Sequence, residues 1–225
     1  MYKAFVSTLI ILSNLLGQNQ NDVRSFPLNS SNNLELINVK AKVVDHDGKN
    51  GIQISKMEGE IKGETLVIIP EITFKNGTIE IELTGEPAPD ADPQMRGFVG
   101  IAFRIDPADY SIYECFYLRP TNARSNNQLQ RNHSIQYVSH PEYPWYRLRD
   151  ESPGQYESYV DLEPGKWTKI KIEVNDKAAK LYVHESTQPC LIVNDLKHEV
   201  SEGKIALWLH SSTLARYRNL IIRQK

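Results

Sequence analysis

The sequence has few cysteines, little net charge and almost no helical patterning. Two cysteines in 225 residues are too few for a disulfide-stapled scaffold. The 26 Lys and Arg residues are offset by 28 Asp and Glu residues, and this net charge of −2 argues against a nucleic-acid partner. Charged residues make up 24% and hydrophobic residues 40% of the chain, which excludes long disordered, collagenous and multi-span membrane architectures.

Several motifs that identify enzymes and metal proteins are also absent. The chain contains no P-loop, no dinucleotide-binding glycine fingerprint and no nucleophile elbow. The segment that begins at Asp45 has Lys56 at its twelfth position, where an EF-hand loop has Glu. The histidines lack the spacing of zinc ligands. The sequence therefore predicts no cofactor and no nameable set of metal ligands.

The first residues have the pattern of a secretory signal peptide. Lys3 precedes an apolar stretch over residues 4–16, which ends at Gly17 and is followed by the polar residues 18–22. This stretch is shorter than the roughly 20 apolar residues of a spanning helix, although an uncleaved anchor is the alternative. We therefore predict a signal peptide over residues 1–20 and one domain over residues 21–225. The mature protein would be secreted or periplasmic, with no membrane span.

Export would expose both cysteines to an oxidising compartment, where a disulfide can persist. Cys115 and Cys190 each lie in an apolar run, however, and free cysteines in such runs often behave as small buried hydrophobic residues. The sequence leaves their pairing open.

Strict alternation of apolar and polar residues is the strongest structural signal. Over residues 78–84, Ile79, Ile81 and Leu83 alternate with threonines and glutamates, and residues 169–174 repeat the pattern. Further strands are predicted over residues 51–55, 65–69, 98–105, 112–119, 134–138, 156–161, 180–184, 191–193, 204–210 and 220–222. Turn pairs such as Asn76-Gly77 separate these strands, and no ordinary amphipathic helix follows the signal segment. The pattern predicts an all-β fold, a two-sheet antiparallel β-sandwich of jelly-roll type.

A long polar connection over residues 120–154 is the expected place for function. It combines aromatic rings, arginines and side-chain amides on a loop carried by a rigid sheet scaffold. Sugars need such a set, because their C–H faces stack on aromatic rings and their hydroxyls need paired donors and acceptors. The alternative is a loop whose aromatic residues only pack it onto the sandwich. The candidate binding residues in this region are Asn122, Arg131, Gln136, Tyr137, Trp145 and Arg147.

The neighbouring strands offer further candidates through the parity of their side chains. In residues 99–105 the apolar row leaves Arg104 on the opposite face, and in residues 204–210 it leaves Trp208 and His210 there. We expect these three side chains to line a groove.

The parity of residues 112–119 is ambiguous around Glu114. Either Glu114 is buried with Phe116 and Leu118, or Tyr113, Cys115 and Tyr117 form the core and Glu114 faces the groove. Because burying an unpaired carboxylate is costly, we favour the second arrangement, with Arg119 turned outward at the strand end.

Four segments resemble concanavalin A-like domains and, more narrowly, the bacterial 3-keto-disaccharide hydrolase family. They are residues 97–104, the pair Tyr113-Glu114, residues 165–174 and residues 203–208. The resemblance implies a jelly roll, secretion and a glycan or modified sugar on the concave sheet, and it leaves room for a structural calcium ion. The Glu-x-Asp-x-Glu signature of family 16 laminarinases is absent, which weakens the case for a retaining glycosidase.

Three functional hypotheses follow. The first is a secreted enzyme that hydrolyses or modifies a glycoside, such as a 3-keto glycoside, with Glu114 as general acid or base and His210 assisting. The second is a non-catalytic carbohydrate-binding module, and the third is a structural or protein-binding sandwich. The predicted substrate-binding residues are Arg104, Tyr117, Arg119, Asn122, Arg131, Gln136, Tyr137, Trp145, Arg147 and Trp208.

Overall fold

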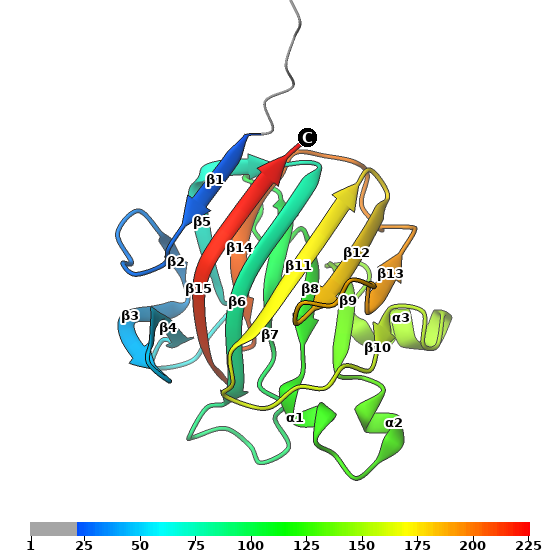
Figure 1. Cartoon of the computed structure of the whole chain (residues 1–225), viewed down its shortest axis with the longest axis horizontal. Helices are drawn as coiled ribbons and strands as arrows, with labels where there is room; N and C mark the ends of the chain where they lie inside the picture. The colour runs from blue at the N-terminus through cyan, green and yellow to red at the C-terminus, as the bar shows by residue number, and fades with distance from the viewer. Residues whose placement is uncertain (1–21) are drawn as a thin grey trace, which may run out of the picture.

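Two antiparallel sheets stacked face to face dominate the computed structural model, which describes residues 22–225 (Figure 1). The predicted two-sheet antiparallel sandwich is confirmed. The signal peptide predicted over residues 1–20 lies outside the described residues. None of the helices in residues 22–225 is long and apolar enough to cross a membrane.

We call the eight-stranded layer the front sheet, because it faces the viewer in Figure 1. Its strands are β1 (Val23–Phe26), β3 (Val39–His46), β4 (Lys49–Lys56), β6 (Gly77–Pro87), β11 (Thr168–Asn175), β12 (Ala178–Val183), β13 (Leu191–Val193) and β15 (Thr213–Gln224). They are ordered β13-β12-β11-β6-β15-β4-β3, and β1 pairs with β15.

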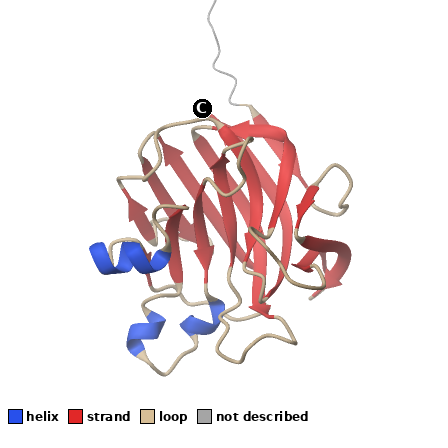
Figure 2. Cartoon of the chain, turned by 180° about the vertical axis from the view of Figure 1, so that it is seen from behind, coloured by secondary structure: helices blue, strands red, loops and turns tan. Residues whose placement is uncertain are grey.

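The second layer is the back sheet, seen from its own side in Figure 2. Its strands are β2 (Glu35–Ile37), β5 (Leu66–Phe74), β7 (Val99–Ile105), β8 (Tyr113–Leu118), β9 (Ile135–His140), β10 (Glu157–Ser158) and β14 (Gly203–Leu209). They are ordered β10-β9-β8-β7-β14-β5-β2. Three short helices, drawn blue in Figure 2, lie beside this sheet: α1 (Pro120–Ala123), α2 (Gln128–Arg131) and α3 (Trp145–Glu151).

The central strands of the front sheet follow the simple alternation that the sequence predicted. Ile79, Ile81 and Leu83 of β6 are at most 1% exposed, and Ile79 and Ile81 lie opposite Ile172 and Ile170 of β11. The glutamates between them are half-buried on the outer face. One apolar face buried against the second sheet supplies the main favourable term in folding, at roughly 1.5–3 kcal/mol for each large aliphatic side chain.

The back sheet is different, because β7 and β8 are buried on both faces along their whole length. Val99 of β7 faces the front sheet, since a Cβ atom placed on Gly85 of β6 would lie only 2.6 Å from its Cγ1 atom. Residues that alternate with Val99, such as Gly100 and Ala102, therefore face outward, away from the front sheet. Cys115 and Cys190 both carry free thiols.

Candidate functional site

A row of side chains crosses the outer face of the back sheet in register. Trp208 lies opposite Gly100, Gly100 opposite Tyr117, Tyr117 opposite Gln136, and Gln136 opposite Glu157. Directly paired residues share a face, so this row runs across β14, β7, β8, β9 and β10. It forms a buried floor that is aromatic at one end and polar at the other.

Gly100 is required in this row by the close approach of the neighbouring strand. A Cβ atom at this position would lie 2.2 Å from the Phe116 carbonyl oxygen and 2.6 Å from the Tyr117 Cβ atom. The missing side chain allows the Tyr117 and Trp208 rings to meet across β7, with their centroids 4.9 Å apart. The two rings support the polar groups above them.

Arg119 lies above this floor, directly after the end of β8. Its guanidinium carbon is 5.0 Å from the centroid of the Tyr117 ring and 5.9 Å from the ring centroids of Phe98 and Trp145. The guanidinium donates hydrogen bonds to the Tyr117 hydroxyl at 2.7 Å and to the His133 carbonyl at 3.1 Å. Because its side chain is only 5% exposed, Arg119 is held in one orientation.

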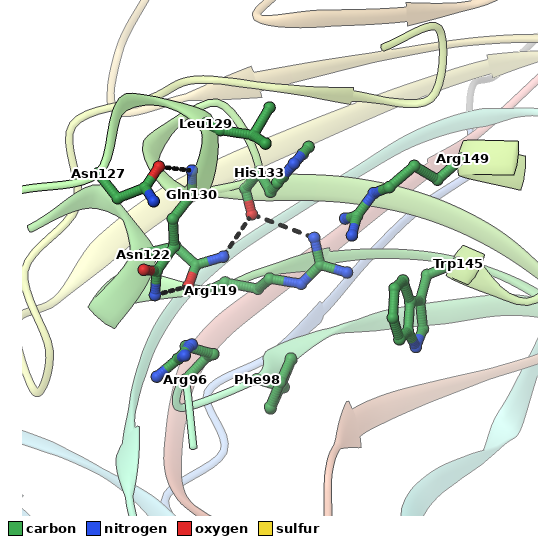
Figure 3. A pocket seen from close by; sticks show the side chains of 10 residues that line it. All are labelled: Arg96, Phe98, Arg119, Asn122, Asn127, Leu129, Gln130, His133, Trp145 and Arg149. Carbon is green, nitrogen blue, oxygen red and sulfur yellow. Dashed lines mark hydrogen bonds between the residues drawn. The ribbon is translucent and has the colours of Figure 1, made fainter. Parts of the chain in front are cut away.

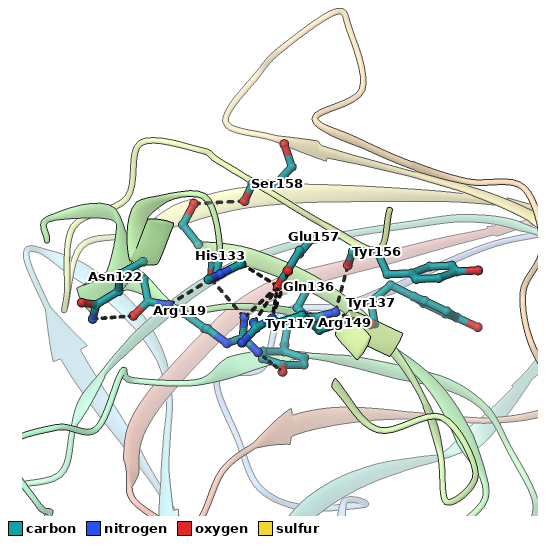
Figure 4. A network of polar contacts seen from close by, with 12 residues as sticks. Tyr117, Arg119, Asn122, His133, Gln136, Tyr137, Arg149, Tyr156, Glu157 and Ser158 are labelled. Atoms are coloured by element: carbon teal, nitrogen blue, oxygen red, sulfur yellow. Dashed lines mark hydrogen bonds and ion pairs between the residues drawn. The ribbon is translucent and has the colours of Figure 1, made fainter. Parts of the chain in front are cut away.

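Glu157 supplies the negative charge for this buried cation (Figure 4). Its carboxylate accepts two hydrogen bonds from Arg149, at 2.6 Å from Nη2 and 3.0 Å from Nε, and lies 3.8 Å from Arg119. His133 Nδ1 is 2.8 Å from the same carboxylate. Burial nevertheless lowers the pKa of His133, which favours its neutral form. The cluster therefore has two guanidinium groups sharing one carboxylate.

A cavity of about 450 Å³ opens beside this cluster (Figure 3). It lies at the end of the back sheet, between the segment carrying α1 and α2 and the helix α3. Its wall contains three arginines, two aromatic rings and three side-chain amides, and no Asp or Glu. The lining residues are Arg96, Phe98, Arg119, Asn122, Asn127, Leu129, Gln130, His133, Trp145 and Arg149.

A second cavity of about 610 Å³ adjoins the first one. The two share Leu129, His133 and Arg149, and the second extends along β10 to Tyr159. Tyr159 is 40% exposed, and the Arg131 guanidinium lies 4.9 Å above its ring. We call the two adjoining cavities together the groove.

Three of the predicted site residues line the first cavity: Arg119, Asn122 and Trp145. Trp145 is 44% exposed, with the Arg149 guanidinium 4.8 Å from its ring centroid. Asn122 is buried and donates to the His133 carbonyl at 3.0 Å. Tyr117 and Gln136 lie in the floor below and are 3% and 1% exposed, so they support the site from beneath.

Four other predicted residues line neither cavity. Arg131 donates to the hydroxyl of Tyr159, which lines the second cavity. Trp208 is buried and donates to the Tyr113 hydroxyl, while His210 contacts Phe98 with ring centroids 5.2 Å apart. Arg147 does not line either cavity: it pairs with Glu151 and stacks over Tyr143.

The predicted position of Arg104 on a groove floor is wrong. Arg104 has a φ of +53°, and the pairing of β14 with β7 shifts register beside it, so the alternation on which the prediction depended breaks there. Its side chain is buried and donates to the Lys75 carbonyl, the Asn76 side chain and the Asp176 carbonyl at 2.9–3.0 Å. Arg104 thus joins the β5–β6 turn to the β11–β12 turn.

The predicted exposure of Glu114 on the groove is also wrong. Glu114 lies opposite Phe103, on the face that packs against the front sheet, and is 0% exposed. Its carboxylate accepts hydrogen bonds from the Tyr137 hydroxyl at 2.5 Å and from the His198 amide at 2.9 Å. Burial raises the pKa of Glu114. These two hydrogen bonds reduce the free-energy cost of burying the Glu114 carboxylate. The bond from Tyr137 also holds that ring in the core, where it cannot stack on a ligand in the groove.

Most residues that line the first cavity were not predicted from the sequence. The main omissions are Phe98, Arg96 and the Glu157–Arg149 pair. Arg149 belongs to the arginine-rich connection that the sequence singled out, so composition could have found it. Arg96 and Phe98 precede β7 and reach the site only because β7 and β8 are paired, which no local pattern reveals. Among residues 22–225, no group of three or more His, Cys, Asp or Glu side chains is placed to hold a metal ion. The structural calcium ion remains a prediction.

Comparison with solved structures finds the same fold at low sequence identity. The carbohydrate binding module CBM66 from Bacillus subtilis is 14% identical, with 84% of this chain and 97% of that chain covered at a TM-score of 0.52. A Bacillus subtilis protein of unknown function with a galectin-like fold is 13% identical, with coverage of 89% and 94% and a TM-score of 0.54. A candidate glycosyl hydrolase from Parabacteroides distasonis is 12% identical, with coverage of 90% and 100% and a TM-score of 0.52.

These similarities establish a lectin-like sandwich and no more than the fold. No family model matches the chain, and no curated protein matches it significantly. Membership of the 3-keto-disaccharide hydrolase family therefore remains a prediction.

Proposed function

We propose that this chain is a carbohydrate-binding domain whose binding site is the groove formed by the two cavities. One observation carries the proposal: the partly exposed Trp145 ring stands beside fixed guanidinium and amide groups in a cavity of about 450 Å³. A flat ring flanked by hydrogen-bonding groups matches a sugar, which has an apolar face and a rim of hydroxyls.

The geometry supports binding over hydrolysis. A glycosidase of the usual kind needs two carboxyl groups, about 5–5.5 Å apart for retention or 6.5–9.5 Å for inversion. The wall of the first cavity has no carboxylate, and Glu114, the predicted acid or base, is sealed between the sheets. Glu157 borders only the second cavity and is occupied by Arg149 and His133. The hydrolase hypothesis, including action on 3-keto glycosides, therefore takes second place.

The solved structures support a sugar partner in a general way, since they include a carbohydrate-binding module. A secreted or periplasmic location belongs to the same proposal, because extracellular glycans are the usual targets of such domains. The sandwich would then act as a rigid support, with the loops and short helices at one end of the back sheet as its binding surface.

The experiment is a glycan array followed by calorimetry on the oligosaccharides that bind. We expect Trp145→Ala to weaken binding by about tenfold or more, because loss of an aromatic anchor in a pocket removes at least about 1.4 kcal/mol. Ile192→Ala is the control: Ile192 lies on β13 of the front sheet, is 47% exposed, close to the 44% of Trp145, and lines neither cavity. Equal affinities of the two variants, or product released from a bound oligosaccharide, would count against a binding domain with this site.

A further inference from the structure

The groove carries more positive charge than its own carboxylate balances. Arg96, Arg119 and Arg149 line the first cavity, while Glu157 is the one carboxylate that contacts any of them within residues 22–225. Arg96 forms no ion pair in this part of the chain; its guanidinium donates instead to the neutral Gln130 side-chain oxygen at 3.1 Å. With three guanidinium groups and one carboxylate, the cluster keeps a formal excess of two positive charges.

This charge is fixed in place by the fold. Arg119 is nearly fully buried and bonded to Tyr117 and His133, and Arg149 is held by two hydrogen bonds to Glu157. Both guanidinium groups also flank the Trp145 ring, at 5.9 Å and 4.8 Å from its centroid. The cations are therefore oriented before a ligand arrives, which reduces the entropy lost on binding.

Three side-chain amides, those of Asn122, Asn127 and Gln130, also line the cavity, and Gln130 contacts Arg96. Asn127 caps α2 by accepting a hydrogen bond from the Gln130 backbone N–H at 3.2 Å (Figure 3). The Gln130 side-chain oxygen accepts from Arg96 Nε at 3.1 Å, and its side-chain nitrogen donates to the Ser125 hydroxyl at 2.9 Å. These amides suit sugar hydroxyls, while the guanidinium groups suit oxygens that carry a full negative charge. The cavity wall thus offers guanidinium groups for an anion and, next to Arg96, amides for hydroxyls.

We propose that the groove selects anionic saccharides, with a carboxylate or sulfate group held among Arg96, Arg119 and Arg149 and the sugar ring against Trp145. The proposal rests on the carbohydrate-binding function above and names the class of sugar. A neutral sugar would cover the same guanidinium groups without supplying a counter-charge, and desolvating cations in this way is costly.

The test is an array in which each acidic oligosaccharide is printed beside a neutral counterpart. Uronate-containing oligosaccharides stand beside the same chains with carboxyl groups reduced to CH2OH, and sulfated oligosaccharides stand beside their desulfated forms. We expect the acidic member of a pair to bind about tenfold to a hundredfold more tightly, since hydrogen bonds between charged groups contribute about 1.5–3 kcal/mol. If only the uronate pairs show a preference, the recognised group is a carboxylate; if only the sulfated pairs show one, it is a sulfate.

Arg96→Gln then tests the assigned residues. We expect the ratio of acidic to neutral affinity to fall by about tenfold, because a guanidinium group without a carboxylate partner is removed. Arg124→Gln makes the same change of net charge at an arginine that pairs with Asp161 and Glu163 outside the groove, and its ratio should equal that of the wild type. A parallel fall in both variants would mean that only overall charge matters.

The outcomes separate this inference from the proposed function. Equal binding of acidic and neutral partners, with Trp145→Ala still weakening both, overturns the anion selectivity and leaves a carbohydrate-binding site. Absence of binding to every oligosaccharide overturns both.

Discussion

Replacing Glu157 by Gln is the most direct test of the charge arrangement in the groove. The substitution keeps the size of the side chain and removes the single negative charge that faces Arg149, Arg119 and His133. An amide can still accept one hydrogen bond, but it cannot neutralise a cation. The consequence should be largest for Arg119, whose side chain is 5% exposed.

The magnitude follows from the burial of the pair. Removing one partner of a buried ion pair costs about 3–5 kcal/mol, because the other charge remains out of water without compensation. Arg149 is 31% exposed and can recover some hydration, so the lower end, about 3 kcal/mol, is expected. For a domain of this size that corresponds to a fall in Tm of about 6–12 °C.

The assay is thermal and urea unfolding of wild type, Glu157→Gln and Glu151→Gln. Glu151 is half-exposed and pairs with Arg147 one helical turn away, so its loss should cost only about 0.3–0.5 kcal/mol. If the two variants lose similar stability, the buried carboxylate is not the counter-charge that holds Arg119, and the structure of the site has been interpreted wrongly.

Two further predictions concern the back sheet. Burial raises the pKa of Glu114 above its ordinary value of 4.5, so the folded protein keeps the Glu114 proton at pH values where the unfolded chain has lost it. Proton binding to Glu114 therefore stabilises the folded state at low pH, and this contribution is lost as the pH rises through the raised pKa. Urea unfolding should therefore show wild type gaining stability relative to Glu114→Gln as the pH falls from about 7 toward 4.5, and a constant difference would contradict this. Gly100→Ala should lower stability by about 1–3 kcal/mol, since its Cβ would collide with backbone at Phe116 and with Tyr117; an unchanged Tm would refute the close approach.

The central strands of the front sheet could be predicted from the sequence because they obey a simple physical rule. In β6 and β11 one face packs against the back sheet and the other is half-buried or exposed, so Ile79, Ile81 and Leu83 alternate with polar residues. The edge strands β1 and β3 bury almost no side chains, and the sequence predicts neither of them. The same rule failed for β8, where both faces are buried and apolar residues occupy both parities. A carboxylate such as Glu114 then gives a misleading signal, because its hydrogen-bond donors lie 23 and 84 residues away.

The site could be predicted only where composition was enough. The connection over residues 120–154 was singled out for its arginines, amides and aromatic rings, and it does supply Arg119's neighbours Asn122 and Trp145. Which of its residues face the groove depends on the register of β8 with β7 and β9. Pairing over this range of sequence is set by the tertiary fold, so Phe98 and Arg96 could not be assigned from local pattern.

Stability and recognition draw on the same residues at this end of the molecule. The bond between Arg149 and Glu157 ties α3 to β10, and the same guanidinium lines both cavities. An anion bound at Arg96 and Arg119 would replace part of the negative charge that Glu157 supplies, because it lies close to the same cluster of cations. An acidic oligosaccharide at a hundred times its Kd stabilises the folded state by about 2.7 kcal/mol through mass action. It should therefore restore much of the Tm lost in Glu157→Gln, whereas its neutral counterpart, at the same concentration, should restore far less.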